Sequence, residues 1–154
     1  MRWEQGRGNI EAMLVAGELE RVSPSAEHAA GLLVQARRHV ASGRLIVEGD
    51  PEGAFQLLYD AARKALWAIL ENQGLRPTSR GGHIAALEAV SAQLDPPMGQ
   101  VLRPFDRLRR QRNKTEYPPR DAPLLTSEGA VRDIPKIDDM IDLAVRVVDE
   151  MSPF

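Results

Sequence analysis

Apolar residues recur along this chain at intervals of three and four, the spacing that places them on one face of an α-helix. The pattern predicts helices over residues 10–22, 23–48, 51–73, 83–94, 95–117 and 133–150. Stretches in which apolar and polar residues alternate are short, so the pattern gives little support for strands. The sequence therefore predicts an all-α fold, an antiparallel helical bundle of four main helices with short accessory helices.

Proline and glycine mark most of the expected helix boundaries. Ser23-Pro24 and Asp50-Pro51 each place a capping residue before a proline at the first helical position, and Asp95-Pro96 repeats this order. Gly74 is well placed to end the helix over 51–73, because glycine adopts the left-handed conformation of a C-cap. Pro118 and Pro119 should stop the helix before them.

The same punctuation suggests how the chain is divided. Residues 76–82, Arg-Pro-Thr-Ser-Arg-Gly-Gly, have the composition of a loop. We expect residues 1–22 to form an N-terminal extension with a short helix. Residues 23–154 then form the main helical domain.

Composition restricts the chemistry. The 154 residues are 43% hydrophobic and 27% charged, as in one globular domain. The chain has no cysteine and only three histidines, which are far apart, so we expect neither a metal site nor a cofactor. A net charge of −2 argues against a protein that coats nucleic acid through bulk charge. No stretch is apolar enough for a signal peptide or a membrane span, which favours a cytoplasmic protein.

The helix predicted over 95–117 carries a stripe of basic residues. Arg103, Arg107, Arg110 and Lys114 follow at i, i+4, i+7 and i+11, opposite the apolar face. A solvated face is the simpler interpretation, and a track for phosphates is the alternative. Between Val101 and Tyr117 the six basic and two acidic residues leave a local charge of +4.

Arg112 departs from this stripe, because it projects into the apolar arc close in angle to Phe105, with Arg109 beside it. A guanidinium on a core-facing arc is costly unless it is paired or lies at a cleft. Arg112 could pair with Glu116 one turn later. It could equally point into a groove shared with another helix, and spacing alone does not decide between the two.

Two further residues stand out. Trp67 lies on the polar arc of its helix, which suggests an interface, although neighbouring helices could also cover it from both sides. His83 follows two glycines at a helix start, where a structural role is commoner than catalysis, yet the chain has few other bases that titrate near neutral pH. His28 and His39 have the pattern of ordinary surface residues.

Three segments together resemble the HEPN superfamily, small helical domains of prokaryotic toxin–antitoxin pairs and RNA-processing systems. Residues 54–66 are similar to the second long helix of such domains, and residues 82–87 to the start of their third. The segment Arg112-Asn113-Lys114-Thr115-Glu116-Tyr117 resembles their signature, an Arg followed after four to six residues by a His. The likeness spans residues 23–151 and leaves the N-terminal helix outside it.

The resemblance implies a metal-free site on RNA, completed when dimerisation brings two copies of the motif into one cleft. Arg112 would bind phosphate and Asn113 would orient it. Tyr117 stands where the family has its histidine. With a reference pKa of ~10, tyrosine is a poor general base at neutral pH, although it can donate a hydrogen bond or stack on a base.

The sequence thus leads to a first hypothesis of a homodimeric RNA-binding protein of HEPN type. Metal-free, toxin-like ribonuclease activity is left open by the degenerate motif Arg112, Asn113 and Tyr117. Under this hypothesis the nucleic-acid contacts come from Arg103, Arg107, Arg109, Arg110 and Lys114. The alternative is a non-catalytic dimeric module, with Trp67 at an interface, that partners a nucleotidyltransferase antitoxin. A bundle that binds a nucleotide ranks last, because no Walker or Rossmann glycine pattern is present.

Overall fold

A computed structural model of the protein describes residues 4–154 and is mostly helical. Its helices are α1 (Arg7–Val15), α2 (Ala26–Ile46), α3 (Pro51–Gln73), α4 (Gly82–Leu94), α5 (Gly99–Leu102), α6 (Pro104–Glu116), α7 (Ser127–Val131) and α8 (Ile134–Glu150). Two short strands, β1 (Leu19–Arg21) and β2 (Leu75–Pro77), pair antiparallel. The predicted helical bundle is confirmed, and a small sheet that the pattern did not predict accompanies it.

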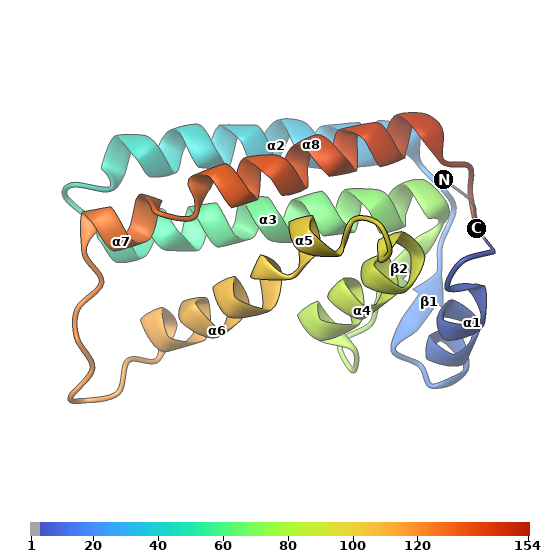
Figure 1. Ribbon diagram of the computed structural model, residues 1–154, viewed down its shortest axis with the longest axis horizontal. Coiled ribbons are helices and arrows are strands. Elements are labelled where there is room, and N and C mark those ends of the chain that lie inside the picture. Colours follow the sequence, from blue (N-terminus) through green and yellow to red (C-terminus); the bar gives the residue numbers. More distant parts are fainter. Residues whose placement is uncertain (1–3) are drawn as a thin grey trace.

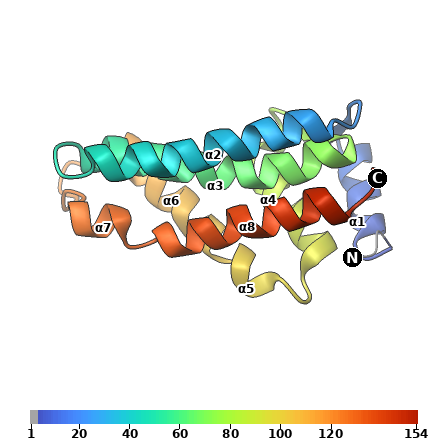
Figure 2. The ribbon, with the colours of Figure 1, turned by 90° about the horizontal axis from the view of Figure 1, so that it is seen from above.

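Helix α3 occupies the centre of the bundle. Helices α2 and α8 pack along one side of it, and α4 and α6 lie on the other (Figures 1 and 2). Along the chain, α2, α3, α6 and α8 alternate in direction (Figure 1). Apolar residues of α3 such as Phe55, Leu58, Leu66 and Ile69 are therefore buried on more than one side. The polar residues that α3 does carry are placed between its neighbouring helices.

Capping residues set the two ends of α3 as the sequence predicts. Asp50 is the N-cap, and its Oδ1 accepts a hydrogen bond of 2.9 Å from the Gly53 amide. Gly74 is the C-cap in the left-handed conformation, with φ of +78°. A Cβ at Gly74 would also lie 2.8 Å from both Pro24 Cγ and the Val22 carbonyl oxygen. Glycine is required here by conformation and by close approach alike.

The N-terminal part corrects two predicted boundaries. The helix expected over 10–22 ends at Val15, and Leu19–Arg21 instead forms β1, with Leu19 opposite Pro77 of β2. The predicted loop over 76–82 accordingly begins as a strand. Helix α2 starts at Ala26 after the N-cap Ser25, two residues later than Pro24 implied. The pairing arises from backbone hydrogen bonds between segments far apart in sequence, which local side-chain spacing does not report.

The helix expected over 95–117 is two helices, α5 and α6. A residue that precedes a proline disfavours the helical conformation, so the prolines at 96 and 97 delay the start until Gly99. Pro104 lacks an N–H and separates α5 from α6, at whose first position it stands. Helix α6 ends at Glu116, before Pro118 and Pro119 as predicted.

The N-terminal segment packs closely on the rest of the fold. Ile10 and Met13 of α1 and Leu19 of β1 are buried, and α1 contacts α4. The division after residue 22 stays a prediction. Within residues 4–154, no helix combines the length and apolar character needed to cross a bilayer.

Candidate functional site

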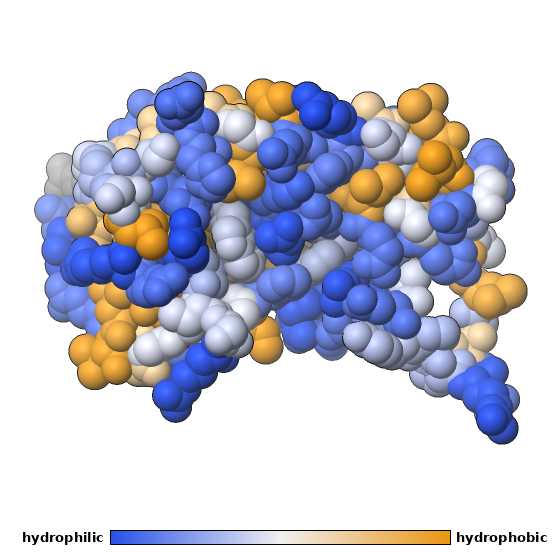
Figure 3. All heavy atoms as spheres, turned by 180° about the vertical axis from the view of Figure 1, so that it is seen from behind, coloured by the Kyte–Doolittle hydropathy of each residue, from blue (hydrophilic) through white to orange (hydrophobic). Residues whose placement is uncertain are grey.

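A shallow cavity of about 290 Å³ opens between α3, α4 and α6. We call it the arginine groove and define it by its lining: Gln56, Leu57, Tyr59, Asp60, Arg63, His83 and Arg112. Seen from behind, the underside of the molecule is notched between the lobe with α4 and the lobe with α6, and mostly hydrophilic residues border the notch (Figure 3). The groove is thus an open, polar site on an otherwise apolar helix junction.

Helical spacing brings these side chains together. Gln56, Asp60 and Arg63 follow at i, i+4 and i+7, so they share one face of α3. Phe105 of α6 is fully buried and holds that helix against α3. Arg112, two turns after Phe105, then points toward the polar face of α3.

Arg112 forms both contacts that the sequence left open. Its Nη1 lies 2.6 Å from Glu116 Oε2, which confirms the pairing within the helix. Its Nε also donates to Gln56 Oε1 at 3.3 Å, and its guanidinium carbon lies 5.9 Å from the centroid of the Tyr59 ring. The side chain is 30% exposed, so it remains accessible from the groove.

His83, in the first turn of α4, is held from two sides. Its Nδ1 shares a hydrogen bond of 2.5 Å with Tyr59 Oη. The Trp67 ring meets the imidazole nearly edge-on, at 87° and 5.5 Å between centroids. Arg63 also covers Trp67, with its guanidinium carbon 5.2 Å from the ring centroid. Trp67 is therefore half-buried between neighbours, as the covered-helix interpretation expects, and a role at an interface stays a prediction.

Burial and nearby cations set the protonation states in the groove. Burial lowers the pKa of His83 below its usual 6.5, and Arg63, Arg112 and Arg109 lower it further, against the opposing effect of Asp60. Burial also raises the pKa of Tyr59 to about 12, although the same arginines oppose that shift. At neutral pH the groove therefore presents a neutral imidazole and a protonated phenol between two guanidinium groups.

Asp60 connects the groove to α2. Burial favours its neutral form, but hydrogen bonds from Arg63 and Lys64 outweigh this effect and lower the pKa of Asp60. Lys64 Nζ lies 3.1 Å from Asp60 Oδ2 and donates to His39 Nε2 at 2.7 Å. His39 is thus half-buried in an ion-pair network, which corrects its assignment as an ordinary surface residue.

Several predicted contact residues have partners within the protein. Arg107 donates to both carboxylate oxygens of Asp133, at 2.6 and 3.0 Å. Arg109 and Arg110 both pair with Asp106 at the start of α6, at 2.9 and 3.1 Å. The other predicted residues lie exposed on or next to α6 and do not line the groove: Arg103, Asn113, Lys114 and Tyr117.

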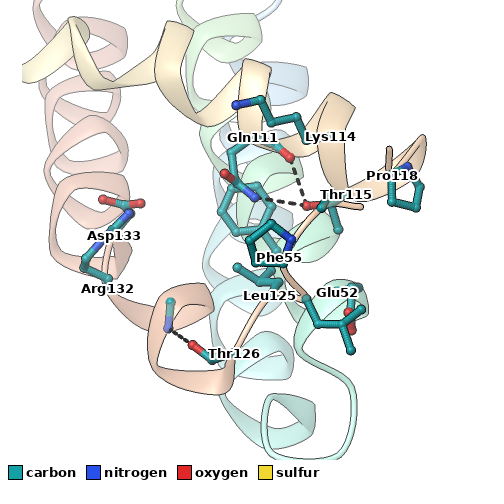
Figure 4. A pocket seen from close by; sticks show the side chains of 14 residues that line it. Glu52, Phe55, Gln111, Lys114, Thr115, Pro118, Leu125, Thr126, Arg132 and Asp133 are labelled. Atoms are coloured by element: carbon teal, nitrogen blue, oxygen red, sulfur yellow. Dashed lines mark hydrogen bonds between the residues drawn. The ribbon is translucent and has the colours of Figure 1, made fainter. Parts of the chain in front are cut away.

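A second cavity, of about 400 Å³, lies on the other side of α6, against α7 and the loop before it (Figure 4). Leu125 and Phe55 lie at its centre in that view, and Thr115 at its edge is hydrogen-bonded to the Gln111 carbonyl at 2.9 Å. Its lining carries charges of both signs: Lys114 and Arg132 are cations, and Glu52 and Asp133 are carboxylates. Although this cavity is larger, its lining holds as many carboxylates as cations and no histidine or tyrosine, so we place the candidate site in the arginine groove.

The sequence pattern alone does not single out Tyr59, Gln56 or Arg63 as site residues. Tyr59 falls within the apolar pattern of α3 and so looks like an ordinary core residue. A signal for the other two does exist, because Gln56, Asp60, Arg63 and Trp67 form one stripe at i, i+4, i+7 and i+11. This stripe marks the face of α3 that turns toward α4 and α6.

Within residues 4–154, no group of three or more His, Asp or Glu is arranged to hold a metal ion. No protein family, curated protein or solved structure shows significant similarity to the chain. The site must therefore be interpreted from its own geometry and chemistry.

Proposed function

We propose that this chain is an RNA-binding protein with a HEPN-like fold whose phosphate-binding site is the arginine groove. One observation carries the proposal: Arg63 and Arg112, from two different helices, converge on one open cavity beside His83 and Tyr59. Guanidinium groups recognise phosphate through paired, charge-assisted hydrogen bonds. Of the segment that carries the HEPN resemblance, Arg112 is the residue that lines the groove.

Exposed residues at the end of α6, outside the groove itself, favour a polyanion over a single small anion. Lys114 is exposed there on the side of the second cavity, and Asn113 beside it is also exposed. Tyr117, 76% exposed after the last turn of α6, offers a ring on which a base can stack. Since the net charge is −2, binding depends on these local cations and not on the field of the whole protein.

Replacement of Arg63 or Arg112 by alanine tests the site. Each loses a charge-assisted contact to phosphate, so we expect affinity for single-stranded RNA to fall about 10-fold. The slope of log affinity against log salt should also fall by about 1 per arginine. Fluorescence anisotropy across a salt series measures both.

Arg37→Ala is the matched control, because Arg37 is also an exposed arginine in an ion pair, with Asp142 at 2.8 Å between α2 and α8. It lies on the far side of α3 from the groove and should leave affinity almost unchanged. Equal losses for Arg37→Ala and Arg112→Ala would reject the groove as the binding site.

Glu116→Gln should strengthen RNA binding. The carboxylate competes with phosphate for Arg112, and exposed ion pairs contribute only about 0.2–1 kcal/mol, so we expect affinity to rise about 2- to 5-fold with stability nearly unchanged. Glu27→Gln, at an exposed position in the first turn of α2, controls for the gain in net charge. A rise of the same size in that control would show that Arg112 is not the group released.

A second candidate function is a non-catalytic dimeric module that partners a nucleotidyltransferase. Tyr117 in the histidine position of the motif and the pairing of Arg112 with Glu116 favour it. In this case Arg112→Ala would leave partner binding intact while RNA binding is absent from the start. Both candidate functions include a cytoplasmic location and a homodimer. Light scattering on the purified protein can test the homodimer.

A further inference from the structure

We propose that His83, positioned by Tyr59, is the proton-transfer residue with which this protein cleaves RNA held in the arginine groove. The inference rests on the proposed function, since the phosphate must first bind between Arg63 and Arg112. It assigns the base to α4 and not to the position of Tyr117 in the α6 motif. The substrate class is RNA, because the reaction uses the ribose 2′-hydroxyl.

Tyr59 holds the imidazole of His83 through one of its two nitrogens. Nδ1 lies 2.5 Å from Tyr59 Oη, and the edge-on ring of Trp67 limits rotation from another side. Within residues 4–154, His83 makes no hydrogen bond through Nε2. A ring held at Nδ1, with no partner for Nε2 among the described residues and on the lining of a cavity, has the geometry of a general base.

The groups that face His83 keep it neutral at working pH. They are Asp60 and Arg63 of α3, Arg109 and Arg112 of α6, and the uncharged phenol of Tyr59. The arginines outnumber the single carboxylate and, together with burial, hold the pKa of His83 below 6.5. The ring is therefore ready to accept a proton at pH 7.

Tyr59 can select the reactive tautomer. A phenol donates one hydrogen bond and accepts others. When a phosphate oxygen in the groove accepts a hydrogen bond from the Tyr59 hydroxyl, the phenol oxygen can only accept from His83, which places the ring hydrogen on Nδ1. The Nε2 lone pair is then free. Tyr59 is a positioning residue in this scheme, and it contributes through the imidazole.

The reaction balances without a cofactor. Nε2 takes the proton of the 2′-hydroxyl while O2′ forms a bond to phosphorus, and the bond from phosphorus to O5′ breaks with its electron pair. O5′ takes a proton from water, and the imidazolium returns its proton to solvent. The products are a 2′,3′-cyclic phosphate and a 5′-hydroxyl. DNA, which has no 2′-hydroxyl, should bind at the groove and remain intact.

The test measures binding and cleavage side by side on one single-stranded RNA and on DNA of the same sequence, in EDTA. The wild type should cleave only the RNA, with a rate that rises with pH through a value below ~6.5 and then levels. His83→Gln should still bind RNA, because Arg63 and Arg112 are retained, and should cleave it at least ~100-fold more slowly. His28→Gln, at an exposed position of α2, is the control and should match the wild type.

The variant Tyr59→Phe tests whether Tyr59 positions His83 or only supports the fold. It should cleave RNA more slowly than the wild type. With inorganic phosphate bound, ¹⁵N NMR should show a single His83 tautomer, protonated at Nδ1, in the wild type and a mixture of tautomers in Tyr59→Phe. RNA binding without cleavage, or undiminished cleavage by His83→Gln, would overturn the inference and leave the proposed function standing. Absence of RNA binding would overturn both. An unchanged tautomer and rate in Tyr59→Phe would remove Tyr59 from the scheme.

Discussion

Replacing Phe105 with alanine should lower the free energy of unfolding by about 3–5 kcal/mol, the range for deletion of a buried phenyl ring. Phe105 is fully buried in the first turn of α6, and its ring centroid lies 5.6 Å from that of Tyr59. The variant loses the transfer free energy of the ring and leaves a cavity between α6 and α3. Most domains of this size are stable by only about 5–15 kcal/mol, so the loss is large. Urea unfolding followed by circular dichroism measures it.

Two variants control this experiment. Leu124→Ala removes an apolar side chain that is 83% exposed, and we expect a change within about 0.5 kcal/mol. Phe105→Leu keeps much of the buried volume and should cost clearly less than Phe105→Ala. If Phe105→Ala were no more harmful than Leu124→Ala, α6 would not be anchored on α3 through this ring, and the placement of Arg112 would lose its support.

The sequence predicted the long helices because their signals are local. Asp50-Pro51 begins α3 and Gly74 ends it, and each acts through backbone groups within a few residues of itself. Burial of α3 on several sides was also foreseeable from its many alanines and leucines. Such features depend on the nearest turn of the chain and are visible without knowledge of the tertiary fold.

The two short strands, β1 and β2, could not be predicted from local signals of this kind. Leu19, Glu20 and Arg21 continue a plausible helical pattern, and their pairing with Leu75–Pro77 depends on segments more than fifty residues apart. Three-residue strands carry too few side chains for a period of two to be recognised. The split at Pro104 was missed because a proline is compatible with a helix start as well as with a continuous apolar arc.

The candidate site was predicted in part. Arg112 was singled out because a cation on an apolar arc needs a partner or a cleft, and it has both. For His83 the sequence favours a structural role and keeps catalysis as the alternative, since nothing local shows that a helix start at 82 lies against residue 59. Tyr59 looked like core, and only the third dimension shows its hydroxyl reaching His83. Sites assembled from three helices are defined by packing that a single sequence does not display.

Arg107→Ala should destabilise the protein by about 2 kcal/mol at pH 7. The change leaves the Asp133 carboxylate, only 3% exposed at the N-cap of α8, without its two hydrogen bonds from Arg107. Breaking a fully buried pair costs about 3–5 kcal/mol, but Arg107 is 40% exposed and Lys136 lies 3.7 Å from Asp133, so we expect less. Thermal or urea unfolding of the two proteins measures the difference.

The effect should depend on pH in a defined direction. Hydrogen bonds from Arg107 lower the pKa of Asp133 below its usual 3.8, against the opposing effect of burial. A carboxyl with a lowered pKa stabilises the fold above its unfolded value, and the contribution is lost as the pH falls through the folded value. The difference between wild type and Arg107→Ala should therefore be full at pH 7 and shrink below pH ~4. Arg37→Ala, which breaks an exposed pair, should change stability by less than about 1 kcal/mol. A difference for Arg107→Ala that stayed constant down to pH ~3 would mean that Asp133 does not titrate with the pair.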